Sequence, residues 1–175
     1  MGFVMSKIII LRGNSGSGKS TVARLLQRQL GRGTLLISQD VVRREMLWVL
    51  DGKDNAAISL MIDLVRYGKA HCDHVILEGI LDAACYRPLF EVIDKEFGGN
   101  TFAYYYDISF QETLHRHQTK PNRADFGEAD MRRWWKERDY MGLIPEKTLT
   151  AEMDTDKTIA LILSDLEFPL RQSMP

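Results

Sequence analysis

Residues 13–20 read Gly-Asn-Ser-Gly-Ser-Gly-Lys-Ser, a complete G-x-x-x-x-G-K-S phosphate-binding loop. Its glycines allow successive backbone N–H groups to converge on phosphate oxygens. Lys19 is expected to reach the β- and γ-phosphates of a nucleotide, and the Ser20 hydroxyl to ligate Mg²⁺. The predicted cofactors are therefore ATP and Mg²⁺. The residues predicted to bind the nucleotide are Gly13, Asn14, Ser15, Gly16, Ser17, Gly18, Lys19, Ser20 and Thr21.

The flanks of this loop argue against a chance Gly/Ser-rich turn. An apolar run at 7–12 precedes it, and a helical pattern at 21–26 follows it. A strand that leads through such a loop into a helix also points the positive end of the helix dipole at the phosphates.

Asp40 is the second residue after a predicted strand, which places its carboxylate beside the phosphate loop. It is a candidate general base that takes the proton from an acceptor hydroxyl, although Asp is also a common helix N-cap. Arg43 follows on the same helical face. It could bind an acidic group of the acceptor, or it could be a solvated side chain or a partner for Asp40.

Glu78 ends the apolar run Val75-Ile76-Leu77. An acid in this place is typical of phosphate-loop enzymes, where it orders Mg²⁺ or a metal-bound water, and a buried carboxylate without such a role would be costly. We therefore expect Glu78 to bind the metal through water or to contact the acceptor hydroxyl.

A basic stretch, including Pro121, looks like a mobile lid over the site. Arg116 and Arg123 are predicted to neutralise charge in the transition state, and Lys120 to contact the substrate. The alternative is an exposed cationic helix end that complements the helix dipole. Residues 131–138 are basic and contain Trp134 and Trp135, which could be core residues or could lie at the acceptor site.

These residues need a scaffold of alternating strands and helices. Alternation of this kind predicts right-handed crossovers and a mostly parallel sheet covered on both faces, with ligands at the carboxyl ends of the strands. The predicted strands span 7–12, 34–38, 74–78, 101–108 and 147–151. The predicted helices span 19–30, 40–50, 55–70, 84–97, 109–118, 128–140 and 155–166.

The composition fits one soluble domain over residues 1–175, with a lid at about 116–140 and a flexible tail at about 167–175. A net charge of −1 gives no general attraction to nucleic acid or anionic lipid. The chain has neither a long apolar run nor a secretion signal, and Cys72 and Cys85 lack metal or redox spacing. We expect a cytoplasmic protein with no membrane partner.

Together, residues 13–20, the segment Asp40-Val41-Val42-Arg43 and the segment 75–79 resemble the small phosphate-loop kinases. This group includes chloramphenicol phosphotransferase, the zeta-toxin kinases and the polynucleotide 5′-hydroxyl kinases. Residues 104–140 are similar to a bacterial branch labelled as AAA family ATPases or kinases. The resemblance implies a three-layer α/β/α fold with a five-stranded parallel sheet ordered 2-3-1-4-5 and a helical lid.

The leading hypothesis is an ATP- and Mg²⁺-dependent kinase acting on a hydroxyl of a small molecule, such as a nucleoside, an antibiotic or a sugar derivative. One alternative is a nucleic-acid 5′-hydroxyl kinase, because of the basic, Trp-bearing segment 131–138. The other is a nucleotide-dependent switch or regulatory ATPase. The sequence leaves open which acceptor is used, whether ATP or GTP is preferred, and the oligomeric state.

Overall fold

A computed structural model describes residues 5–119 and 126–172 of the chain. Five strands form one parallel sheet in the order β2-β3-β1-β4-β5, as expected from the sequence. The phosphate loop follows the central strand, because β1 lies between β3 and β4. The strands are β1 (Lys7–Gly13), β2 (Leu35–Ser38), β3 (His74–Gly79), β4 (Thr101–Tyr106) and β5 (Glu146–Leu149).

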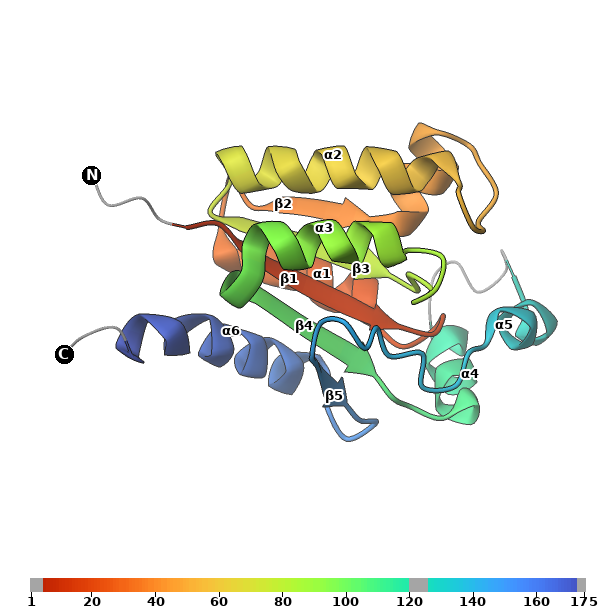
Figure 1. Ribbon diagram of the computed structural model, residues 1–175. Coiled ribbons are helices and arrows are strands. Elements are labelled where there is room, and N and C mark those ends of the chain that lie inside the picture. Colours follow the sequence, from red (N-terminus) through yellow and green to blue (C-terminus); the bar gives the residue numbers. More distant parts are fainter. Residues whose placement is uncertain (1–4, 120–125, 173–175) are drawn as a thin grey trace.

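Helices cover both faces of the sheet, so the fold has the expected three layers (Figure 1). Side chains alternate along a strand, and β1 therefore contributes to two cores. Ile8 and Ile10 pack with α2 and α3, whereas Ile9 and Leu11 pack with α1 and α6. These covering helices are α1 (Lys19–Leu30), α2 (Ala56–His71), α3 (Arg87–Phe97) and α6 (Thr155–Gln172).

Two shorter helices, α4 (Phe110–Gln118) and α5 (Glu128–Trp134), lie at the end of the sheet to which the arrows of β1 and β4 point (Figure 1). Ser109 caps α4, because its side chain accepts a hydrogen bond from the backbone N–H of Glu112. A 3₁₀ turn, η2 (Gly98–Asn100), leads into β4. Because all the strand pairs are parallel, the carboxyl ends of the strands lie at one edge of the sheet, the edge where the phosphate loop lies.

The helix predicted at 40–50 is shorter in the structure and is mostly π-helical. The chain forms a short π-helical turn, η1 (Val41–Met46), and then a loop. The backbone N–H of Leu47 bonds back to the carbonyl of Val42, five residues earlier, and Trp48 takes a positive φ of 52°. A bulky residue in that conformation cannot continue a right-handed helix.

The predicted helix at 128–140 is also too long, since α5 ends at Trp134 and Trp135 is extended. Helix α3 begins at Arg87 rather than near 84, because the Asp82 carboxylate accepts the backbone N–H groups of Ala84 and Cys85 in a turn. Helix α6 continues to Gln172, into the stretch that we expected to be frayed. Over the residues that the structure describes, no helix is long and apolar enough to cross a membrane.

Candidate active site

The phosphate loop closes tightly against the rest of the site. Gly13 has φ +144°, and a Cβ there would lie 2.8 Å from the Cβ of Tyr106. Gly16 has φ +86°, and a Cβ there would lie 2.6 Å from the carbonyl oxygen of Thr113. Any side chain at either position would be strained and would push on β4 or α4, so both glycines are required by this geometry.

Lys19 is buried, and its side chain folds back to bond two residues of the loop. Its Nζ donates to the carbonyl oxygen of Asn14 at 2.8 Å and to the Ser17 hydroxyl at 3.0 Å. A cavity of about 450 Å³ opens on this side of the loop. We call it the nucleotide-side cavity. Its lining includes Gly16, Ser17, Gly18, Thr21, Arg116 and Asp154.

Arg116 reaches the phosphate loop from α4. Its Nη1 donates to the carbonyl oxygen of Ser17 at 2.9 Å, and its Nη2 donates to that of Ala151 at 3.1 Å. Glu112 holds the Nε of the same guanidinium at 2.6 Å. This arrangement keeps a positive charge beside the loop that binds phosphate. The predicted contacts of Lys120 and Arg123 lie outside the described residues.

Glu78 lies at the end of β3, beside the residue predicted to ligate Mg²⁺. Its Oε2 accepts a hydrogen bond from the Ser20 hydroxyl at 3.1 Å, and its Oε1 accepts one from Ser38 at 2.5 Å. The side chain is buried, and parallel pairing sets the contact with Ser38 because Ser38 and Glu78 are register partners. Ser38 was missed by the sequence analysis, since a single serine at a strand end carries no distinctive signal.

The Ser20 hydroxyl and the Glu78 carboxylate supply oxygen ligands of the kind that fit Mg²⁺, a hard cation that binds one or two protein oxygens, waters and phosphates. Within residues 5–119 and 126–172, no cluster of three or more His, Cys, Asp or Glu side chains could hold a metal by itself. A Mg²⁺ ion at this place would therefore need a nucleotide to supply its remaining ligands, and Ser20 and Glu78 are the residues that would hold it.

We expect the substitution Glu78→Gln to raise the Mg²⁺ concentration needed for half-maximal binding of an ATP analogue by about 10- to 100-fold. The amide keeps an acceptor for Ser20 but loses the charge that orders metal-bound water. Titration of AMP-PNP binding against Mg²⁺ measures the effect. The exposed Glu91→Gln variant on α3 is the matched control. An unchanged Mg²⁺ dependence in Glu78→Gln would remove this residue from the metal site.

Asp40 lies just before η1, with no cap hydrogen bond from its side chain. Its Oδ1 is shared by two cations, Arg43 Nη2 at 3.0 Å and Arg44 Nε at 3.3 Å. In the described part of the chain no donor contacts the other carboxylate oxygen, Oδ2. Asp40 is therefore held in place with one oxygen available to accept a proton.

A second cavity, of about 480 Å³, opens on the other side of the phosphate loop. We call it the acceptor-side cavity. Ser15 of the loop, Asp40 and Arg43 contribute to its wall. The two tryptophans differ in position: Trp134 lines this cavity, whereas Trp135 packs edge-on against Phe110. Glu78 does not line this cavity, so the expected contact of its carboxylate with the acceptor hydroxyl has no support from the cavity lining. The other lining residues are Gln39, Arg44, Leu50, Asp51, Ile80, Asp82, Phe126, Arg133 and Lys136.

A polar network around Arg12 in β1 was not predicted from the sequence. The Arg12 side chain is fully buried, and its Nη1 and Nη2 pair with Glu146 at 2.8 Å and Asp139 at 3.0 Å. Its Nε and Nη2 also donate to the carbonyl oxygen of Leu81. A charged residue inside an apolar buried strand was the available signal, because a buried charge requires partners.

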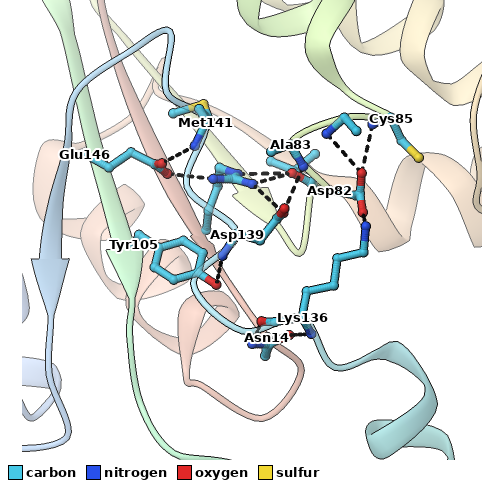
Figure 2. A network of polar contacts seen from close by, with 12 residues as sticks. Asn14, Asp82, Ala83, Cys85, Tyr105, Lys136, Asp139, Met141 and Glu146 are labelled. Carbon is cyan, nitrogen blue, oxygen red and sulfur yellow. Dashed lines mark hydrogen bonds and ion pairs between the residues drawn. The ribbon is translucent and has the colours of Figure 1, made fainter.

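Asn14 of the phosphate loop extends this network to Lys136 (Figure 2). The Asn14 amide accepts from the backbone N–H of Lys136 at 2.9 Å and donates to its carbonyl oxygen at 2.6 Å. The Lys136 ammonium pairs with Asp82. These contacts fix the segment after α5 and explain why that helix stops at Trp134.

A protein-family model described as "AAA domain" matches residues 8–143, which is most of the chain. The match spans the phosphate loop and every residue that lines the acceptor-side cavity, and it ends before Glu146 of the Arg12 network and Asp154 of the nucleotide-side cavity. It confirms the AAA-type branch that the sequence resembled. No curated protein matches the sequence.

Several solved kinases have a similar fold. The Mycobacterium tuberculosis APS kinase in complex with AMPPNP and APS is 23% identical, with a TM-score of 0.67 over 93% of this chain and 98% of that chain. A Sinorhizobium meliloti gluconokinase is 15% identical, with a TM-score of 0.68 and coverage of 97% and 99%. The shikimate kinase of Acinetobacter baumannii in complex with shikimate is 19% identical, with a TM-score of 0.58 and coverage of 99% and 98%. The resemblance to small phosphate-loop kinases is therefore confirmed at the level of fold.

Proposed function

The chain belongs to the AAA domain family, and we propose that it is an ATP- and Mg²⁺-dependent phosphotransferase that moves the γ-phosphate of ATP to a hydroxyl of a small molecule. One observation carries this proposal. The phosphate loop contributes to two cavities, with Gly16 to Gly18 on one side and Ser15 on the other. A kinase needs both a nucleotide site and an acceptor site, and the γ-phosphate lies where they meet.

In this proposal each residue has a defined task. The loop and Lys19 hold the phosphates, and Mg²⁺ beside Ser20 and Glu78 supplies charge neutralisation when bound. Asp40 accepts the acceptor's hydroxyl proton on Oδ2, while the oxygen of that hydroxyl attacks the γ-phosphorus and the bond to the ADP oxygen breaks. Arg116 stabilises the negative charge that spreads over the transferred group.

A nucleic-acid 5′-hydroxyl kinase is the second candidate, because Trp134 and Arg133 line the acceptor-side cavity. An aromatic ring beside a guanidinium could stack a terminal base. The switch hypothesis gains no comparable support, because a regulatory ATPase has no use for a carboxylate facing a second cavity.

The test is transfer of label from γ-labelled ATP in the presence of Mg²⁺. The acceptor panel contains nucleosides, sugars and sugar acids, aminoglycosides, chloramphenicol-like compounds and 5′-hydroxyl oligonucleotides. Label in a small molecule supports the proposal, and label confined to oligonucleotides supports the second candidate. ATP hydrolysis with no labelled acceptor, and equal in an Asp40→Asn variant, would contradict both.

A further inference from the structure

The carboxylates that line the acceptor-side cavity have few oxygens left for a ligand. Asp51 Oδ1 accepts hydrogen bonds from Tyr86 and from the backbone of Gly52, and its Oδ2 accepts one from Gln39. Burial, and then the hydrogen bond to Asp51, raises the pKa of Tyr86, so the phenol keeps its proton and donates it. Asp82 is fully engaged as well, with two backbone N–H groups on Oδ1 and Lys136 on Oδ2.

The cations that line the same cavity keep unused donors. Among the described residues, Arg44 pairs only with Asp40, Arg133 only with Asp130, and the Lys136 ammonium only with Asp82. A guanidinium has five N–H donors and an ammonium has three, so most of them remain available. All three side chains are also about half exposed or more.

Arg43 adds a stronger observation. Its Nη1 and Nη2 contact Val49 and Asp40, but its Nε is buried and has no hydrogen-bond partner in the described part of the chain. A buried donor without a partner is costly, and in native proteins such a group is usually satisfied by water or a ligand. Arg43, which lines the acceptor-side cavity beside Asp40, therefore has one N–H donor without a partner among the described residues.

The described lining of the cavity thus has more unused cationic donors than unused carboxylate oxygens. From this difference we infer that the molecule phosphorylated at this site carries an acidic group, a carboxylate or a phosphate, in addition to its reactive hydroxyl. Among the described residues, a ligand in the cavity meets several cationic donors and one free carboxylate oxygen, Asp40 Oδ2. The hydroxyl is bound by Asp40, and the acidic group is bound by the cations around it. This inference rests on the proposed function and narrows its substrate class.

Lys136 is the residue we assign to bind that acidic group. The Asn14 side chain bonds both the N–H and the carbonyl oxygen of the Lys136 backbone, and Asp82 pairs with the Lys136 ammonium (Figure 2). A cation whose position is set by the phosphate loop can hold the acceptor in register with the γ-phosphate. It loses little conformational freedom on binding, which favours affinity.

The test compares matched pairs of hydroxyl compounds by calorimetry on protein saturated with AMP-PNP and Mg²⁺. The pairs are D-gluconate with D-glucose, glycerol 3-phosphate with glycerol, and adenosine 5′-monophosphate with adenosine. We expect the acidic member of at least one pair to bind about 10- to 100-fold more tightly than its neutral partner, the range for hydrogen bonds to charged groups. The carboxylate and phosphate pairs distinguish the two kinds of acid.

In the Lys136→Gln variant we expect this preference to fall about tenfold or more, and in Lys136→Arg to be largely kept. The affinity for AMP-PNP is expected to stay unchanged in both. The matched control is Lys147→Gln, because Lys147 pairs with Asp165 and lies outside the acceptor-side cavity.

Three results would overturn the inference: no acidic probe binds, acids bind no better than their neutral partners, or the preference survives in Lys136→Gln. None of these removes the proposed function if a neutral acceptor is labelled in an Asp40-dependent way. Conversely, acid binding with no transfer to any acceptor, and no effect of Asp40→Asn, would contradict the kinase proposal while keeping the anion site.

Discussion

Replacement of Asp40 by asparagine is expected to lower kcat for phosphoryl transfer by about 10²- to 10⁴-fold, the usual contribution of a general base. The amide oxygen of asparagine can still accept hydrogen bonds from Arg43 and Arg44, so the local geometry is kept. It cannot take a proton from the acceptor. The Kd for ATP is expected to stay unchanged, because Asp40 lies on the acceptor side of the phosphate loop.

Steady-state kinetics at saturating ATP with varied acceptor checks this prediction, because it separates kcat from KM. Asp94→Asn, an exposed substitution on α3, is the control and should leave both constants unchanged. A variant with a raised KM for the acceptor and an unchanged kcat would show that Asp40 binds the acceptor without acting as its base.

The parts of the site that the sequence predicted are those encoded locally. The phosphate loop is one octapeptide whose flanks specify a strand and a helix, and the structure places Ser20 within hydrogen-bond distance of Glu78. Strand alternation predicts the parallel sheet, and a parallel sheet brings the carboxyl ends of β2 and β3 to one edge. That is enough to place Glu78 and Asp40 near the loop.

The parts that the sequence did not predict depend on contacts between distant segments. Residues 128–140 have a helical pattern, but Asn14, 122 positions from Lys136, binds the backbone at that point and the helix ends. The π-helical turn at 41–46 is a different case, because the backbone hydrogen bonds that close it are local. Local propensity is a weak prior where a few tertiary hydrogen bonds decide the outcome.

A second large effect, on stability, is predicted for loss of the buried Arg12 side chain. We expect Arg12→Leu to lower the free energy of unfolding by about 3–5 kcal/mol, the usual cost of removing one partner from a buried ion pair. The substitution leaves Asp139 and Glu146 without their cation, and the Glu146 side chain is only 1% exposed. It also removes two hydrogen bonds to the carbonyl oxygen of Leu81. Urea denaturation followed by circular dichroism measures the change.

The exposed pair of Arg66 and Glu96 offers a matched control, since Arg66→Leu should change the free energy of unfolding by only about 0–1 kcal/mol. Arg12→Lys should remain destabilising, because one ammonium cannot reproduce the several directed donors of a guanidinium. Leucine at position 12 with little loss of stability would mean that the two acids are reached by water. In that case the segment from Lys136 to Glu146 would be held by Asn14 and by Tyr105, whose hydroxyl accepts the backbone N–H of Asp139, rather than by Arg12.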